Sequence, residues 1–82
     1  MLDVKFEDDF LKAVEKIRDN RFKEKIKKQT AKILNNPEIG KPMKYNRKGT
    51  REVYILPFRL SYAYIKEENK IVFLEIYHKD EQ

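Results

Sequence analysis

The sequence has no cysteine, only one histidine and only two glycines among its 82 residues. Without cysteine the chain has no disulfide framework, no thiol nucleophile and no thiolate metal site. A single histidine without cysteine is also a poor ligand set for zinc, and two glycines do not build a glycine-rich phosphate loop. The composition therefore argues against metal, thiol and phosphate-loop chemistry, and we expect no cofactor.

Long apolar runs are missing as well. The longest one is far shorter than the roughly 20 residues that a membrane-spanning helix needs. Residues 1–10 have no basic region followed by an apolar core, so they do not look like a signal peptide. These absences predict a cytoplasmic protein without a membrane partner, and the length predicts a single domain over residues 1–82.

Positive charge is concentrated in the middle of the chain. Residues 21–51 carry eleven Lys or Arg and two acids, a net charge of +9, whereas the other residues sum to −4. Such a segment is typical of a surface that binds nucleic acid or an acidic protein. The ordinary alternative is a solvated, lysine-rich helix face.

Apolar periodicity predicts one strand and two helices in the first half. Alternation predicts a short strand over residues 2–6. Helical spacing predicts helices over about 8–18 and 21–35, and the second ends before Pro37 because proline cannot continue it. The second helix carries a row of cations, Arg21, Lys25, Lys28 and Lys32. Like charges at this spacing repel one another, so the row favours an anionic partner.

The second half reads as a long loop followed by three strands. Prolines, glycines and asparagines predict a loop over residues 35–50, with a short strand at 43–45. Period-two alternation then predicts strands over 52–56, 58–66 and 71–78. The order β-α-α-β-β-β predicts an α+β domain, an antiparallel sheet of about four strands with an N-terminal helical hairpin packed on one face.

Arg59 stands out in this pattern because it interrupts an apolar strand. The large residues of its strand share the other parity, so they pack on the helices while Arg59 faces the open side. An arginine there is costly unless its head reaches water, a carboxylate or a phosphate. We interpret Arg59 as facing a bound polyanion, and pairing with an acid on the sheet surface is the alternative.

The side chains present suit metal-free RNA cleavage, in which a 2′-hydroxyl attacks the adjacent phosphate. The protein must then supply cations, a proton acceptor and a proton donor. Arg59 and Arg51 are candidates for the phosphate, and Tyr54, Tyr77 and His78 for base stacking or proton transfer. Sheet packing is the alternative for the tyrosines, and a structural role is the alternative for His78.

The chain resembles the RelE/ParE toxin superfamily of toxin–antitoxin pairs over essentially its whole length. The resemblance lies in the basic helical hairpin, the N-N-P break and the strands GTREVYI, FRLSYAY and IVFLEIYHK. Its most specific part is the strand with Phe58, Arg59, Leu60 and Tyr62, followed by a last strand that ends in His-Lys. A RelE-like fold is the expectation that follows.

In the RelE branch, the resemblance implies a metal-independent, ribosome-dependent mRNA endonuclease that acts in the ribosomal A site. It also implies silencing by an acidic, RelB-like antitoxin in a higher-order hetero-oligomer. The ParE branch implies instead a protein that inhibits DNA gyrase by binding. A catalytically weak relative of RelE is a further alternative.

Carried onto this sequence, the resemblance implies that Arg59 holds the scissile phosphate and Arg51 assists. Tyr54 or His78 would stack on the RNA or transfer protons. Two positions where the RelE branch places lysines hold Glu52 and Tyr54 here. The expected RNA-binding residues are Lys25, Lys28, Lys32, Lys44, Arg47, Lys48 and Lys79.

Overall fold

The computed structural model describes residues 2–43 and 49–78. These residues form two helices, five strands and one short 3-10 turn. In chain order the elements are β1 (Asp3–Phe6), α1 (Asp8–Lys16), α2 (Asn20–Asn35), β2 (Lys41–Pro42), β3 (Thr50–Ile55), β4 (Phe58–Ile65), η1 (Lys66–Glu68) and β5 (Lys70–His78). The α+β class is confirmed, and the predicted helices and long strands match within two residues at each end.

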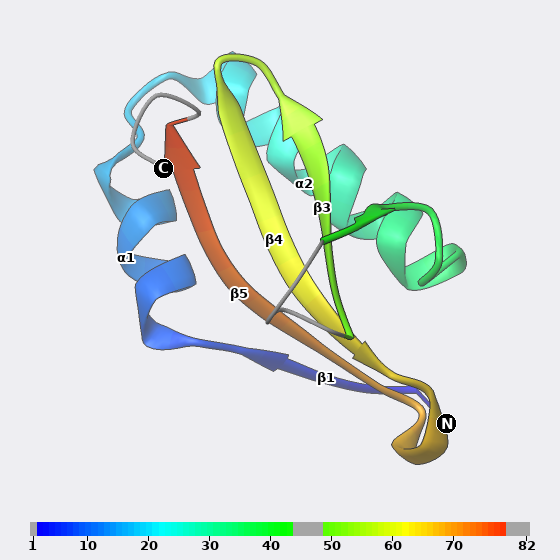
Figure 1. The fold of residues 1–82 in the computed structure, drawn as a ribbon. Coiled ribbons are helices and arrows are strands. Elements are labelled where there is room, and N and C mark those ends of the chain that lie inside the picture. The colour runs from blue at the N-terminus through cyan, green and yellow to red at the C-terminus, as the bar shows by residue number, and fades with distance from the viewer. Residues whose placement is uncertain (1, 44–48, 79–82) are drawn as a thin grey trace.

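The five strands form one sheet in the order β1-β5-β4-β3-β2, and both helices lie on the same face of it (Figure 1). The sheet is mixed, whereas an antiparallel one was expected, because β1 pairs parallel with β5. Parallel neighbours need a long crossover, and here everything between the two strands forms it. The short strand β2 lies at Lys41–Pro42. Of the strand predicted at 43–45, Met43 is not in a strand, and residues 44 and 45 lie outside the described residues.

Local signals explain where the helices begin and end. Asp8 and Asp9 lie in the first turn of α1, where carboxylates favour the helix dipole. The Asp19 side chain caps α2 by accepting a hydrogen bond from the backbone N–H of Arg21 at 2.9 Å. Pro37 follows the end of α2. Among the described residues, no helix is long and apolar enough to cross a bilayer.

The core lies between the helices and one face of the sheet. It contains Phe10 of α1, residues Ile26 and Ile33 of α2, and inward side chains of β3, β4 and β5. Leu60 and Tyr62 are fully buried, so the large-residue parity of β4 packs on the helices as predicted. We call the other side of the sheet the open face, because neither helix covers it.

Tyr62 also ties the connection after α2 to the sheet. Its phenol donates to the carbonyl oxygen of Pro37 at 2.8 Å and accepts from the N–H of Gly40 at 2.9 Å. A Cβ at Gly40 would lie 2.6 Å from the Tyr62 hydroxyl oxygen, so only glycine fits this approach. Burial raises the pKa of the Tyr62 phenol above its ordinary value.

Candidate active site on the open face

Three adjacent strands bring four functional side chains together on the open face. Tyr54 of β3 is paired with Arg59 of β4, and Arg59 is paired with Tyr77 of β5. Glu52 lies two residues before Tyr54, on the same side of β3. We call these four residues the Glu52 cluster.

The carboxylate of Glu52 is the centre of this cluster. It accepts a hydrogen bond from the Tyr77 hydroxyl at 3.0 Å and a longer one from the Tyr54 hydroxyl at 3.4 Å. The Arg59 Nη1 atom lies 3.5 Å from it, and the guanidinium carbon lies 5.0 Å from the centroid of the Tyr54 ring. A single carboxylate therefore orients one cation and two phenols.

The burial of Glu52 explains why these partners are needed. The residue is only 9% exposed, and a buried carboxylate without donors would be strongly destabilising. The Arg59 side chain remains 23% exposed. Arg59 thus lies on the open face as its parity predicts, and in the free protein it is paired with an acid, which was the alternative interpretation.

A small cavity adjoins the cluster at the end of the β3–β4 hairpin. It has a volume of about 180 Å³ and is lined by Tyr54, Leu56, Phe58 and Arg59. The cation of the cluster is therefore accessible to a small ligand from solvent. The described residues contain no group of three acids or histidines placed to hold a metal ion.

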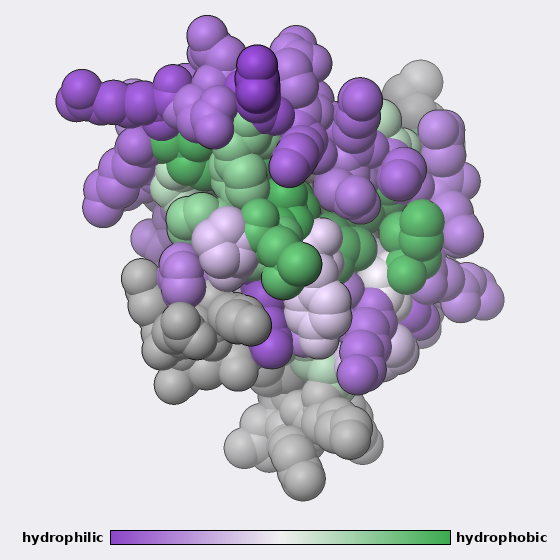
Figure 2. All heavy atoms as spheres, turned by 90° about the horizontal axis from the view of Figure 1, so that it is seen from above, coloured by the Kyte–Doolittle hydropathy of each residue, from purple (hydrophilic) through white to green (hydrophobic). Residues whose placement is uncertain are grey.

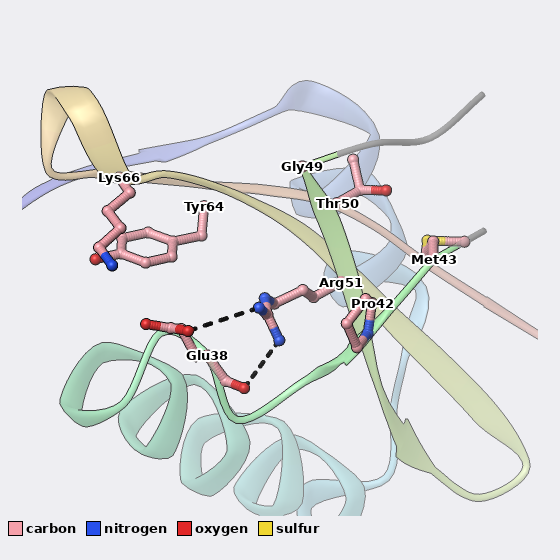
Figure 3. A pocket seen from close by; sticks show the side chains of 8 residues that line it. All are labelled: Glu38, Pro42, Met43, Gly49, Thr50, Arg51, Tyr64 and Lys66. Carbon is pink, nitrogen blue, oxygen red and sulfur yellow. Dashed lines mark hydrogen bonds and ion pairs between the residues drawn. The ribbon is translucent and has the colours of Figure 1, made fainter. Parts of the chain in front are cut away.

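Arg51 lies on the opposite face of the sheet from Arg59, pointing between the sheet and the end of α2 (Figure 3). Its Nη1 donates to the carbonyl oxygens of Glu38 at 2.9 Å and Gly40 at 2.8 Å. Its Nη2 also lies 3.9 Å from the Glu38 carboxylate. The structure does not bring the two predicted phosphate-binding arginines together. Arg51 is three residues before Tyr54 on β3, and side chains at an odd spacing along a strand lie on opposite faces of the sheet, so Arg51 lies on the helix side.

His78 also lies on the helix side. Its ring meets the edge of Phe58 with centroids 5.4 Å apart, and it lines a cavity of about 410 Å³ beside α1. Of the four predicted catalytic residues, the structure therefore groups Arg59 with Tyr54. Tyr77, a candidate for base stacking or proton transfer, joins them, and the structure adds Glu52.

Glu52 was not among the site residues predicted from the sequence. It was noted only because the RelE branch places a lysine at this position. A usable signal was present in the β3–β4 hairpin. A turn at residues 56–57 pairs Tyr54 with Arg59, and alternation then places Glu52 on the same face, diagonally from Arg59.

The expected RNA-binding residues fall into two groups. Lys25, Lys28 and Lys32 are exposed on α2, and the helical period turns them away from the buried Ile26 and Ile33. They are therefore on the far side of the molecule from the Glu52 cluster. The others, Lys44, Arg47, Lys48 and Lys79, lie outside the described residues.

Comparison with known proteins identifies the family. Residues 3–82 match the family described as the ParE toxin of the type II toxin–antitoxin system parDE. Because this match spans nearly the whole chain, the protein belongs to that family, within the RelE/ParE toxin superfamily. A search of curated protein sequences found no match.

Solved structures of several toxins share the fold. A chain of the intact RelBE toxin–antitoxin complex from E. coli is 19% identical, with a TM-score of 0.79 over 95% of this chain and 96% of that chain. The YoeB/ParE toxin from Agrobacterium tumefaciens is 17% identical, with a TM-score of 0.82 over 94% and 98%. YafQ from E. coli is 19% identical, with a TM-score of 0.78 over 99% and 97%. At these identities the likeness concerns the fold.

Proposed function

We propose that this toxin is a metal-independent mRNA endonuclease that acts in the cytoplasm on ribosome-bound mRNA. The observation that carries the proposal is the Glu52 cluster. It places a cation, a mostly buried carboxylate and two phenols together on the open face. These are the groups that 2′-hydroxyl attack on a phosphodiester requires.

In the proposed reaction, the Glu52 carboxylate accepts the proton of the 2′-hydroxyl as its oxygen attacks the adjacent phosphorus. Arg59 binds the non-bridging oxygens and stabilises the charge that develops on them. The bond to the 5′-oxygen breaks, and the Tyr77 phenol donates a proton to that oxygen. The products are a 2′,3′-cyclic phosphate and a 5′-hydroxyl. The 3.0 Å hydrogen bond between the Tyr77 hydroxyl and Glu52 then returns the proton and resets both groups.

Arg51 and His78 have other roles in this proposal. Arg51 holds the segment after α2 against the sheet from the far side. His78 packs on Phe58 beside α1, so neither side chain reaches the phosphate held by Arg59. The exposed row on α2 with Lys25, Lys28 and Lys32 would contact ribosomal RNA, while the open face receives the mRNA.

Two substitutions test the catalytic assignment. We expect Arg59→Ala to lower mRNA cleavage in a translation extract by roughly 10²- to 10³-fold, since one charge-stabilising group is lost. Glu52→Gln keeps the shape but removes the proton acceptor, and a loss of similar size is expected. Arg18→Ala, an exposed arginine between the helices, is the control. Wild-type cleavage by Arg59→Ala, with circular dichroism showing an intact fold, would refute the assignment.

Gyrase inhibition is the second candidate, and the matched family favours it because it is named for ParE. The Arg59–Glu52 pairing also fits a protein that acts by binding. The same extract distinguishes the two functions. Intact mRNA together with blocked DNA supercoiling by purified gyrase would support this candidate and exclude the nuclease.

An antitoxin is the partner we propose for the chain. Structural relatives are seen in complex with antitoxins, in RelBE of E. coli and RelBE2 of Mycobacterium tuberculosis. The net charge of +5 suits an acidic, partly disordered partner, in a higher-order hetero-oligomer. A small acidic reading frame next to this gene should restore growth on co-expression, and failure of every neighbouring frame to do so would count against the proposal.

A further inference from the structure

The Arg59 guanidinium already has an anion beside it in the free protein. Its Nη1 atom lies 3.5 Å from an oxygen of the Glu52 carboxylate. The two groups carry opposite charges, so together they offer no net charge to a polyanion. A phosphate that approaches this cation therefore meets one that is already paired.

We infer that the Glu52 carboxylate is an internal competitor of the substrate: it occupies the anion-binding position on Arg59, and a phosphodiester has to displace it. The inference rests on the proposed function, in which Arg59 binds the scissile phosphate. It adds to that function a control on how readily the phosphate binds.

The ion pair is loose enough to be exchanged. Its 3.5 Å separation is longer than the roughly 2.8 Å of a charge-assisted hydrogen bond. Within the described part of the chain, the buried Nε atom of Arg59 has no hydrogen-bond partner. An arginine that holds an anion well donates from two nitrogens at once. The non-bridging oxygens of a phosphodiester can therefore replace the carboxylate with better geometry.

Glu52 also keeps partners when Arg59 leaves it. Its carboxylate accepts hydrogen bonds from the Tyr77 hydroxyl at 3.0 Å and the Tyr54 hydroxyl at 3.4 Å, so Arg59 is the most distant of its three partners. A buried carboxylate without donors would be strongly destabilising, and the two phenols prevent that. The Glu52 side chain is only 10% exposed whereas that of Arg59 is 23% exposed, so Arg59 is the partner that moves.

A phosphate reaches Arg59 through the cavity of about 180 Å³ at the end of the β3–β4 hairpin. Seen from this end of the molecule, apolar side chains gather at the middle of the surface, with hydrophilic side chains around them (Figure 2). The other lining residues of the cavity, Tyr54, Leu56 and Phe58, are aromatic or aliphatic. Such walls exclude water and strengthen the attraction between the cation and either anion.

Because Glu52 belongs to the same chain, its effective concentration at Arg59 is high. A free oligonucleotide in dilute solution therefore competes poorly with it. A strand that other contacts already hold nearby competes at a high effective concentration of its own. The Glu52–Arg59 pair thus favours RNA that has been positioned beforehand.

The test measures binding of a short, fluorescently labelled RNA that 2′-O-methyl groups make uncleavable. Fluorescence anisotropy gives its affinity for wild type and variants at one salt concentration. We expect Glu52→Gln, which keeps the shape but removes the charge, to bind roughly 10-fold more tightly than wild type, the value of one charge-assisted hydrogen bond. The gain should disappear in an Arg59→Ala background, because the carboxylate then has no cation to occupy.

Glu75→Gln is the matched control. Glu75 lies two residues before Tyr77 on β5, so it is on the same face, and the change in net charge is the same. A gain as large as that of Glu52→Gln would overturn the inference, as would a gain from Glu52→Gln that persists without Arg59. Circular dichroism checks that each variant is folded.

Tyr77→Phe tests the inference in the opposite direction with the charges unchanged. The carboxylate then has one donor fewer, so it should hold Arg59 more firmly and lower the RNA affinity by a few-fold. This loss should vanish when Glu52 is also replaced by glutamine, which separates it from a direct contact between the phenol and RNA. A loss of the same size in the Glu52→Gln background would count against the competition.

These measurements need neither ribosomes nor turnover, so they are independent of the nuclease assay. Tighter binding by Glu52→Gln, with no cleavage of ribosome-bound mRNA by wild type, would refute the nuclease and retain the competition. Cleavage by wild type without any gain in affinity from Glu52→Gln would do the reverse.

Discussion

Tyr62 places a hydroxyl inside an apolar core, and the structure shows how this is tolerated. The phenol donates a hydrogen bond to the Pro37 carbonyl and accepts one from the Gly40 N–H, and both groups belong to the segment after α2. Without such partners the hydroxyl would be destabilising. The residue is therefore a polar link between a strand and a loop as much as a core side chain.

We expect Tyr62→Phe to lower the free energy of unfolding by about 1–3 kcal/mol, because the Gly40 N–H and the Pro37 carbonyl lose their partner. Urea denaturation at neutral pH measures this change. A variant as stable as wild type would show that water replaces the phenol at no cost.

The same residue makes stability depend on high pH. Burial raises the pKa of Tyr62 above its ordinary value of 10.0, so above pH 10 the folded chain keeps a proton that the unfolded chain loses. Its contribution is complete below pH 10 and is lost as pH rises through the folded pKa. Wild type should therefore lose stability more steeply than Tyr62→Phe above pH 10. Parallel curves for the two proteins would contradict this.

At the scale of elements, Gly40 connects two strands of the sheet to the chain that leaves α2. Its carbonyl accepts from Arg51 of β3 at 2.8 Å, and its N–H donates to Tyr62 of β4 at 2.9 Å. The two side chains hold one peptide segment from both sides, so their contributions should be coupled.

A double-mutant cycle with Arg51→Met and Tyr62→Phe measures this coupling. We expect each single change to be destabilising and the pair to be less destabilising than the sum, by about 0.5–3 kcal/mol. Once one anchor is lost, the segment moves and the second anchor is worth less. Arg18→Met with Tyr62→Phe is the control cycle. Additive effects of Arg51 and Tyr62 would mean that the two anchors act independently.

At the scale of the whole molecule, the sheet separates two charged regions. The Glu52 cluster lies on the open face, and the exposed lysines of α2 face away from it. One RNA strand of a few nucleotides does not reach both, so the two regions would contact different anions. Under the proposed function, the helices would bind a large RNA and the sheet would bind the substrate strand.

Replacing Lys25, Lys28 and Lys32 with glutamine should weaken binding to ribosomes and make it less dependent on salt, by up to about three units of slope. The fold should become slightly more stable, because like charges on one helix face repel by a few tenths of a kcal/mol per pair. Cosedimentation at several salt concentrations and thermal unfolding measure the two effects. The control replaces Lys12, Lys16 and Lys66 and has the same net charge. Equal weakening in both would show that only net charge matters.

The sequence by itself determined the elements and the faces. Period-two alternation depends only on backbone geometry, so it placed Arg59 on the open side and the large residues of β4 in the core. Charge spacing along α2 likewise placed its lysines on one exposed face. These features depend on residues close in sequence, which a single sequence displays directly.

Only the tertiary structure decided which residues meet. The parallel pairing of β1 with β5 and the hydrogen bonds from Arg51 to the segment after α2 join residues that local periodicity does not relate. The ion pair between Glu52 and Arg59 depends in addition on the register of the β3–β4 hairpin, which alternation alone does not fix. A pattern tells which way a side chain points, but a hydrogen bond or an ion pair depends on strand register and on how the loops return. For that reason the sequence supplied the arginine of the site, and the fold supplied the acid that holds it.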